Sequence, residues 1–256
     1  MCLITFANNA HPKYQLVFAG NRDEFYERPT RKAQFWTEEG HPNILAGKDI
    51  QGGGTWLGVH KDGRWATLTN YRDLSDIKED APTRGDLPLE FLKNSRSAVD
   101  YLDELKQTAH QYNGFNLLLS DESGIFHFSN QDNKITEVAP GVHGLSNALL
   151  DTSWPKTERA KAGLTKVLQH EEMDKEALFS LLTDEMKAPD SELPETGLSQ
   201  KMERLVSSIF IKSEDYGTRC STVFLIDRDG NIDFTERTFE PGSTSVKEEQ
   251  HFSFNG

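Results

Sequence analysis

Short apolar runs rich in β-branched and aromatic residues occupy both ends of the chain. Residues 3–7 (LITFA) and 14–20 (YQLVFAG) are separated by a polar stretch, which predicts a β-hairpin. Asp62-Gly63 and Asp229-Gly230 stand between further pairs of runs, where glycine accepts the positive φ of a tight turn. The same pattern predicts strands at residues 55–60, 64–70, 115–120, 125–129, 142–146, 221–227 and 232–236.

Helical spacing appears in the middle of the chain. Residues 97–110 place Val99, Leu102, Leu105 and Ala109 on one face, which predicts an amphipathic helix. Two more helices are predicted at residues 155–168, with a proline in the first turn, and at residues 175–187. The proline-containing acidic segment 188–197 predicts a surface loop, and the polar residues 242–256 predict a flexible tail.

The order of strands, helices and strands again lacks the regular alternation of a parallel sheet. It predicts an α+β domain whose sheet assembles from both chain ends. With 256 residues the chain can bury a large core, and we expect one domain over residues 1–256.

Charge and composition exclude several classes of function. Acidic residues outnumber basic ones by 41 to 28 and the basic residues are scattered, which argues against nucleic-acid binding. The sequence has neither an apolar run of about 18 residues nor a signal-peptide pattern, so we expect a cytoplasmic protein with no membrane span. The eight histidines are dispersed without a metal-binding motif, so neither a metal nor a cofactor is expected.

Cys2 is the residue with the clearest chemical potential. Trimming of Met1 would leave a thiol and an α-amine on one terminal residue. An α-amine has a pKa near ~7.7–8.0 and can accept the thiol proton at neutral pH. One residue could therefore supply both the nucleophile and its base.

Four sequence blocks carry a family resemblance. They are NRDEFYERPT (21–30), GGGTWLGVHKDGRWATLTNYR (52–72), GVHGLSNALLDTSWPK (141–156) and YGTRCST (216–222). In this order they resemble the NRDE-motif proteins, which include the transport and Golgi organisation 2 proteins, from residue 2 to about residue 240. That family is similar to cysteine N-terminal-nucleophile hydrolases such as bile salt hydrolase and penicillin V acylase. The resemblance implies a four-layer αββα sandwich with mostly antiparallel sheets, and cleavage of amide bonds other than peptides.

The resemblance also implies a role for individual residues. Cys2 would be the nucleophile, and Asp23 would hydrogen-bond its amine or thiol. Asn70 would stabilise the oxyanion, Asn147 would be a second site asparagine, and Arg219 would favour the thiolate. Four residues of the same blocks are assigned to substrate binding, namely Asn21, Arg22, Trp56 and Tyr71.

This chain departs from those hydrolases at one place. They carry an arginine three residues before the aspartate, where this chain has Gly20. On a strand Arg22 and Asp23 point to opposite faces, so Arg22 is not a simple replacement. Structural alternatives stay open: Arg22 and Asp23 could form a strand-end salt bridge, the two asparagines could be turn residues, and Arg219 could pair with a surface acid. Cys220 is expected in the core, and the glycine triplet 52–54 is expected to form a tight turn rather than a phosphate loop.

Two functions follow from this pattern. The first is a thiol hydrolase that acts on a small-molecule linear or cyclic amide through a thioester on Cys2. The alternative is a carrier that binds a hydrophobic ligand, such as an acyl-CoA, another lipid or haem, in the same cleft, with His143 as a candidate haem ligand. The substrate and the oligomeric state are left open.

Overall fold

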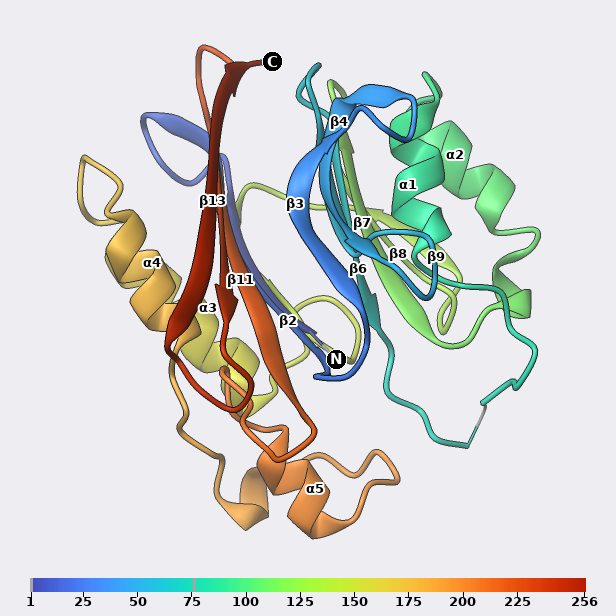
Figure 1. The fold of residues 1–256 in the computed structure, drawn as a ribbon, viewed down its shortest axis with the longest axis vertical. Coiled ribbons are helices and arrows are strands. Elements are labelled where there is room, and N and C mark those ends of the chain that lie inside the picture. The colour runs from blue at the N-terminus through green and yellow to red at the C-terminus, as the bar shows by residue number, and fades with distance from the viewer. Residues whose placement is uncertain (1, 76) are drawn as a thin grey trace. The chain divides into compact units, whose positions relative to one another are not determined.

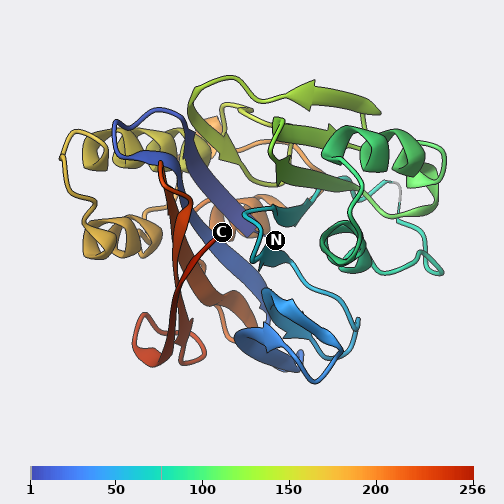
Figure 2. The ribbon, with the colours of Figure 1, turned by 90° about the horizontal axis from the view of Figure 1, so that it is seen from above.

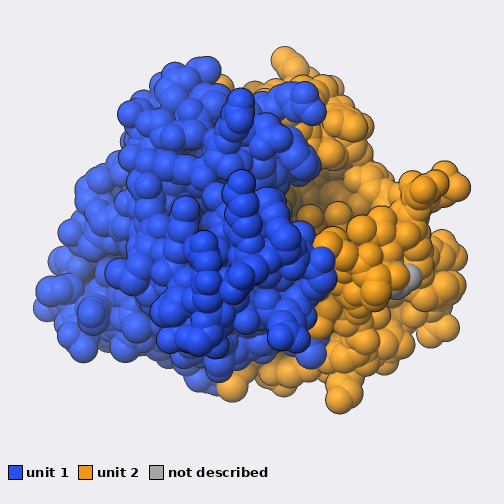
Figure 3. Space-filling model, turned by 90° about the horizontal axis from the view of Figure 1, so that it is seen from below, with its two compact units in different colours: residues 1–27, 140–253 blue, residues 28–139, 254–256 orange. Residues whose placement is uncertain are grey.

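The chain forms two antiparallel β-sheets, each with helices packed on one face (Figure 1, Figure 2). This is seen in a computed structural model that describes residues 2–75 and 77–256. Two compact units result, and Figure 3 colours them separately: the residues up to Glu27 with Pro140–Ser253, and Arg28–Ala139 with Phe254–Gly256. The first unit thus takes its strands from both chain ends, as the sequence predicts.

The sheet of the first unit has six strands. Their order is β10 (Gly141–Leu145), β1 (Cys2–Asn8), β2 (Tyr14–Phe25), β11 (Tyr216–Asp227), β12 (Asn231–Phe239) and β13 (Val246–Asn255). The predicted hairpin forms between β1 and β2, with Ile4 opposite Gly20. β2 in turn pairs with β11, so the two ends of the chain meet in the middle of this sheet.

The two faces of this sheet bury different side chains. One face packs Ala7, Val17 and Ala19 against Leu164 of α3 (Pro155–Val167) and Leu178 of α4 (Lys175–Leu182). The other face carries a cross-strand row of four buried phenylalanines, which are Phe6, Phe18, Phe224 and Phe234. Because side chains alternate along a strand, each residue near the start of β1 can be assigned to one of these faces.

The sheet of the second unit has seven strands. Their order is β3 (Thr30–Trp36), β4 (His41–Asp49), β5 (Leu57–His60), β6 (Trp65–Asn70), β7 (Phe115–Asp121), β8 (Gly124–Ser129) and β9 (Lys134–Glu137). The helices α1 (Asp86–Lys93) and α2 (Ala98–Leu105) cover one face, where Phe91 and Leu102 pack against Leu68 and Leu117.

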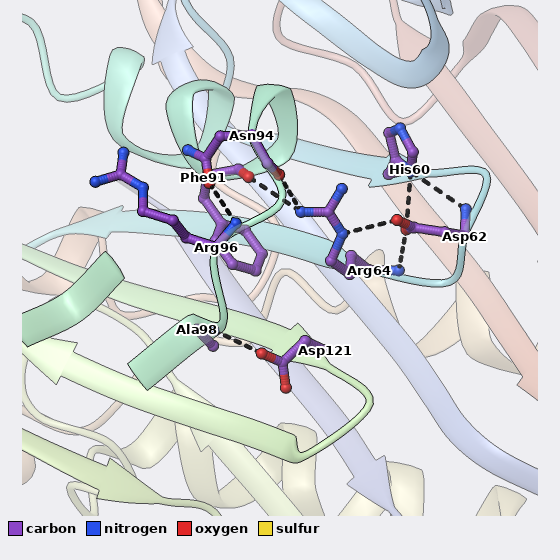
Figure 4. A network of polar contacts seen from close by, with 8 residues as sticks. All are labelled: His60, Asp62, Arg64, Phe91, Asn94, Arg96, Ala98 and Asp121. Atoms are coloured by element: carbon purple, nitrogen blue, oxygen red, sulfur yellow. Dashed lines mark hydrogen bonds and ion pairs between the residues drawn. The ribbon is translucent and has the colours of Figure 1, made fainter. Parts of the chain in front are cut away.

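A polar network ties the β5–β6 hairpin to the end of α1 (Figure 4). Arg64 Nε donates to Asp62 Oδ2 at 2.8 Å, and a terminal nitrogen of the same guanidinium donates to the carbonyl of Asn94. Nearby, the Asp121 carboxylate accepts from the Ala98 backbone N–H at 2.6 Å, where α2 begins. These contacts satisfy polar groups at a helix end and at a helix start, which otherwise lack partners.

Most predicted elements are confirmed, and the glycine turn has a clear cause. A Cβ on Gly54 would lie 2.2 Å from the backbone carbon of Gly85, so only glycine permits this approach of two backbones. The tight-turn interpretation of residues 52–54 is therefore confirmed. The α+β class with antiparallel sheets is also confirmed, and each unit supplies a helix layer on a sheet. Among the described residues, no helix is both long and apolar enough to cross a membrane.

Other predictions differ from the structure. Val99 was placed on the buried helix face but is 37% exposed, and α4 ends at Leu182 rather than residue 187. The tail predicted to be flexible from residue 242 instead forms β13, in which Phe252 packs edge-on against Phe234. Several elements of the structure were not predicted, namely β3, β4, β9, α1, the short helix α5 (Gln200–Leu205) and two 3₁₀ turns at Ala109–Gln111 and Asp190–Glu192.

Candidate active site

Cys2 begins β1 and is half-buried. Its cross-strand neighbour on β2 is Arg22, and Arg22 in turn lies opposite Cys220 of β11. These three residues form one row on the face that also carries Phe6 and Phe18. Met1, whose removal the mechanism requires, lies outside the described residues. The thiol at the strand start therefore faces a guanidinium directly across the hairpin.

The Cys2 thiol is not activated in the untrimmed chain. Burial raises its pKa, and the Asp23 charge adds to this effect. The charge of the amino terminus opposes it most, and the Arg22 charge and a hydrogen bond from the Asp23 backbone N–H act in the same lowering direction, but together they do not cancel the effect of burial. At neutral pH the thiol is therefore protonated, and a reaction at Cys2 needs a base.

Arg22 shares its face with Cys2 and Gly20, while Asp23 points to the helix-covered face. This alternation is the one expected from the sequence. Arg22 is buried and lies 3.8 Å from the carboxylate of Glu24. At Gly20 a Cβ would lie 3.1 Å from the Phe18 ring and 3.3 Å from the Leu3 carbonyl, which leaves little room for a side chain. The cation on this face therefore stands two residues further along β2, opposite the thiol.

Asp23 is 2% exposed on the helix-covered face. Its Oδ1 accepts a hydrogen bond from Thr218 Oγ1 at 2.7 Å. Thr218 Oγ1 in turn accepts a hydrogen bond from the Ile211 backbone N–H at 2.9 Å. Burial raises the pKa of the Asp23 carboxyl above its ordinary value, and the opposing effects of the amino-terminal charge, of Lys156, of the Thr218 hydroxyl and of Arg22 do not cancel it. The buried Lys156 was not among the predicted site residues.

Asn21 is also buried on the helix-covered face. Its side-chain amide donates to the carbonyls of Leu182 at 2.8 Å and Ile209 at 2.9 Å, and its oxygen accepts from the Ser221 hydroxyl. These contacts tie β2 to the last residue of α4 and to the segment that follows α5. Asn21 thus has a structural role, and its substrate contact stays a prediction.

Arg219 lies at a β-bulge in β11. Thr218 pairs with Asp23 and Cys220 pairs with Arg22, so Arg219 is the extra residue between them. Its guanidinium is half-buried and donates to the carbonyl of Phe25 at 2.6 Å. The bulge keeps Arg219 at the end of the sheet that carries Cys2.

Cys220 is 4% exposed, and burial raises its pKa well above the ordinary value. The predicted core position is confirmed.

Asn147 follows β10, and Ser146 connects it to Cys2. The pairing of β10 with β1 ends where Leu145 lies opposite Ile4, and Ser146 and Asn147 follow directly in the chain. The hydroxyl of Ser146 lies 2.9 Å from the carbonyl oxygen of Cys2 and 3.3 Å from Asn147 Oδ1. Both residues are buried. Ser146 was missed by sequence reasoning, although it belongs to the LSN motif.

Three predicted residues belong to the second unit. Asn70 ends β6 opposite Phe115, and the backbone N–H of Tyr71 donates to the Gly114 carbonyl at 2.9 Å. The Trp56 ring lies against Gly47, where a Cβ would come within 2.3 Å of it. The roles of Asn70, Trp56 and Tyr71 stay predictions.

His143, the candidate haem ligand, is held by its own neighbours. Its Nδ1 lies 2.7 Å from Asp151 Oδ2, and its ring packs on Phe6 with centroids 5.3 Å apart. Within the described ranges, no three histidine, cysteine or acidic side chains gather as a metal site would require.

Comparisons with known proteins identify relatives along the whole chain. The family model of Transport and Golgi organisation 2 matches residues 1–241. The transport and Golgi organization protein 2 homolog of Bos taurus is 36% identical, with 93% of each chain covered. The Homo sapiens homolog is 34% identical over 99% of each chain, and an uncharacterized Saccharomyces cerevisiae protein is 26% identical over 99% of each.

Two solved structures are also similar, both at 11% identity. One is the C2A mutant of conjugated bile acid hydrolase from Clostridium perfringens, with a TM-score of 0.49 over 100% of this chain and 97% of that one. The other is the Caenorhabditis elegans ortholog of N-acylethanolamine-hydrolyzing acid amidase, with a TM-score of 0.44 over 88% and 92%.

Proposed function

The chain belongs to the Transport and Golgi organisation 2 family, and from this premise and the geometry around Cys2 we propose that it is an N-terminal-nucleophile thiol hydrolase. Its substrate would be a small linear or cyclic amide other than a peptide, and Cys2 would attack after Met1 is removed. The names of the curated relatives specify no reaction, so the proposal rests on this chain's own residues.

One observation carries the proposal. Cys2 starts a strand in the interior of the sheet, directly opposite Arg22, with the Asp23 backbone N–H hydrogen-bonded to the thiol. Trimming of Met1 would turn the Cys2 backbone nitrogen into an amine at this same place. That amine is the base which the protonated thiol lacks.

The proposed reaction has two halves. In the first, the α-amine takes the proton from Sγ, and sulfur attacks the amide carbon; the carbonyl oxygen becomes an oxyanion that the Asn147 amide would stabilise. The C–N bond then breaks, the α-ammonium returns the proton to the leaving amine, and a thioester remains on Cys2. In the second half, the α-amine takes a proton from water and the resulting hydroxide attacks the thioester carbon. The C–S bond then breaks, a carboxylic acid leaves, and the α-ammonium returns its proton to sulfur, which restores the thiol.

Arg22 and Asn147 supply different contributions. The Arg22 guanidinium would favour the thiolate as it forms, because an opposite charge stabilises the ionised sulfur. An amide that donates to the oxyanion lowers the activation barrier by about 3 kcal/mol, so Asn147→Ala should lower kcat by about 10²-fold. Asn70 keeps the oxyanion role implied by the resemblance as a further prediction.

The test uses protein whose amino terminus is verified by intact mass. N-acyl amides and lactams are supplied to the trimmed protein, and release of the amine or opening of the ring is followed by mass spectrometry. We expect turnover with trimmed protein and a mass increase on Cys2 in a rapid quench. Cys2→Ala should abolish both signals. Turnover that survives in Cys2→Ala, or that is equal in protein retaining Met1, would overturn the proposal.

The carrier alternative gives a different result in the same experiment. A carrier would show a ligand-dependent rise in Tm that is unchanged in Cys2→Ser, with no product. That outcome would replace the hydrolase proposal with a binding function.

A further inference from the structure

A second buried charge lies near Asp23 in the first unit. The Lys156 side chain is 2% exposed, and its Nζ atom is out of contact with solvent. Lysine is almost never fully buried unless a charge or a hydrogen-bond network compensates it. The same holds for Asp23, which is equally buried. Two opposite charges inside one unit therefore call for a common explanation.

The side of α3 that faces the sheet can be followed one turn at a time. Leu164, Ala160 and Lys156 are four residues apart, so they lie on one side of the helix. Leu164 packs in the cluster that contains Ala19. Ala160 packs in the cluster that contains Leu3.

The strand pairing shows where the next turn leads. Leu3 lies opposite Asn21, so Ala160 stands over the row of Asn21 while Leu164 stands near the row of Ala19. Four helical residues advance about 6 Å, and two strand residues advance about 6.6 Å. One turn before Ala160, Lys156 therefore lies near the next row on that face, which contains Asp23 on β2, while α3 itself packs on β1 and β10.

We propose that Lys156 is a positioning residue of the proposed active site: its buried ammonium group compensates the buried Asp23 carboxylate and keeps it ionised beside the start of β1. The inference rests on the proposed function in one respect: the role given to the ionised Asp23 carboxylate is to hold the terminal amine of a trimmed Cys2. The pairing of the two charges itself does not depend on turnover.

The electrostatics agree with this geometry. Burial raises the pKa of Asp23 above its ordinary value; the charge of the amino terminus opposes this most, and Lys156 comes next, ahead of the Thr218 hydroxyl and Arg22. An ionised carboxylate can accept hydrogen bonds from the terminal amine, whereas a protonated one would compete as a donor. Lys156 thus supplies a positive charge near Asp23, where the similar hydrolases have an arginine at the position of Gly20. It does so from α3 rather than from β2.

Other titratable groups lie near Asp23 on its own strand and on the neighbouring strands. They are Cys2 on β1, Arg22 and Glu24 on β2, and Arg219 on β11. All of them remain in every Lys156 variant, so they set a constant background for the titration.

The experiment titrates the Asp23 carboxyl directly by ¹³C NMR of protein labelled at aspartate side chains, with Asp23→Asn identifying the signal. In Lys156→Met we expect the pKa of Asp23 to rise by at least about one unit, because a nearby buried cation is lost. Lys156→Arg should restore a value near that of the wild type. Lys161→Met is the matched control: it removes a lysine of the same helix that pairs with Asp151, and it should leave Asp23 unchanged.

A second measurement follows the reactivity of the Cys2 thiol. In trimmed protein, the pH profile of Cys2 alkylation should shift in Lys156→Met and return in Lys156→Arg, whether or not the protein turns over any amide. An unchanged Asp23 titration in folded Lys156→Met would overturn the inference, while absence of turnover alone would count only against the proposed hydrolase. If Lys156→Met fails to fold, Lys156→Met with Asp23→Asn should fold, since no unpaired charge remains; failure of this double variant would overturn the pairing.

Discussion

The loop between β10 and α3 depends on one carboxylate, and Asp151→Asn tests that dependence. Asp151 Oδ1 accepts from the Gly144 backbone N–H at 2.9 Å and lies 3.1 Å from Lys161 Nζ, while Oδ2 lies 2.7 Å from His143 Nδ1. The residue has a φ of +58°, which asparagine also tolerates. The substitution therefore removes the charge with little added backbone strain.

The magnitude follows from the pKa of this carboxyl. Burial alone would raise it, but hydrogen bonds from His143, Gly144 and Lys161 outweigh burial and lower it from 3.8 to about 2. The difference corresponds to about 2.5 kcal/mol at most. Because the side chain is 34% exposed, solvent screening reduces this to about 1–1.5 kcal/mol.

The sign of the pH dependence is fixed by the direction of the change. A carboxyl whose pKa is lower in the folded state stabilises the fold fully above its unfolded pKa of about 4, and this contribution is lost as the pH falls towards 2. Urea unfolding should therefore show Asp151→Asn less stable than the wild type by about 1–1.5 kcal/mol at neutral pH, with a smaller difference at about pH 3. Asp215→Asn, an exposed carboxylate of the same unit, is the control for the charge change. A difference that is absent, or that stays constant from pH 7 to pH 3, would refute the reasoning.

Two further results are expected. Gly54→Ala should lower the free energy of unfolding by about 3 kcal/mol or more in denaturant titrations, because neither the new Cβ nor the Gly85 backbone can move away. Gly40→Ala, at a positive φ but in open space, should lower it by about 1 kcal/mol. Similar costs for both would contradict the close approach. In trimmed protein an electrophilic thiol probe should label Cys2 at least about tenfold faster than Cys220, since Cys220 is buried with its pKa well above the ordinary value; peptide mass spectrometry would expose equal labelling.

Sequence patterns located the elements that bury apolar residues in a simple period. The β1–β2 hairpin and α3 were found because their apolar residues recur at strand or helix spacing. β3 was missed because Lys32 and Gln34 interrupt its apolar residues, and β4 because its apolar run is only the three residues 44–46. β13 was missed because none of its side chains is buried and most are exposed, so its sequence shows no apolar period, and its place is set by pairing with β12.

Site residues that belong to a sequence motif could be predicted. Those whose position depends on tertiary packing could not. Cys2 and Asn147 stand out from motif position, and the structure brings them together through Ser146. Lys156 ends the block 141–156 that carries the family resemblance, but no role was predicted for it, because it sits on a mostly polar helix and only tertiary packing shows that it is buried. The bulge at Arg219 likewise depends on how β11 pairs with β2, which no local pattern specifies.

The two faces of the first sheet divide the proposed chemistry between them. The thiol of Cys2 and the guanidinium of Arg22 share one face, while the carboxylate of Asp23 and the ammonium of Lys156 belong to the other. A side chain on one face cannot readily take a proton from a side chain on the other, because the main chain lies between them. The group that can serve both faces is the backbone nitrogen of Cys2 itself, once it is an amine. If the proposal holds, this is why the base must be the chain terminus rather than an aspartate or histidine, and why the charges beneath it must be balanced.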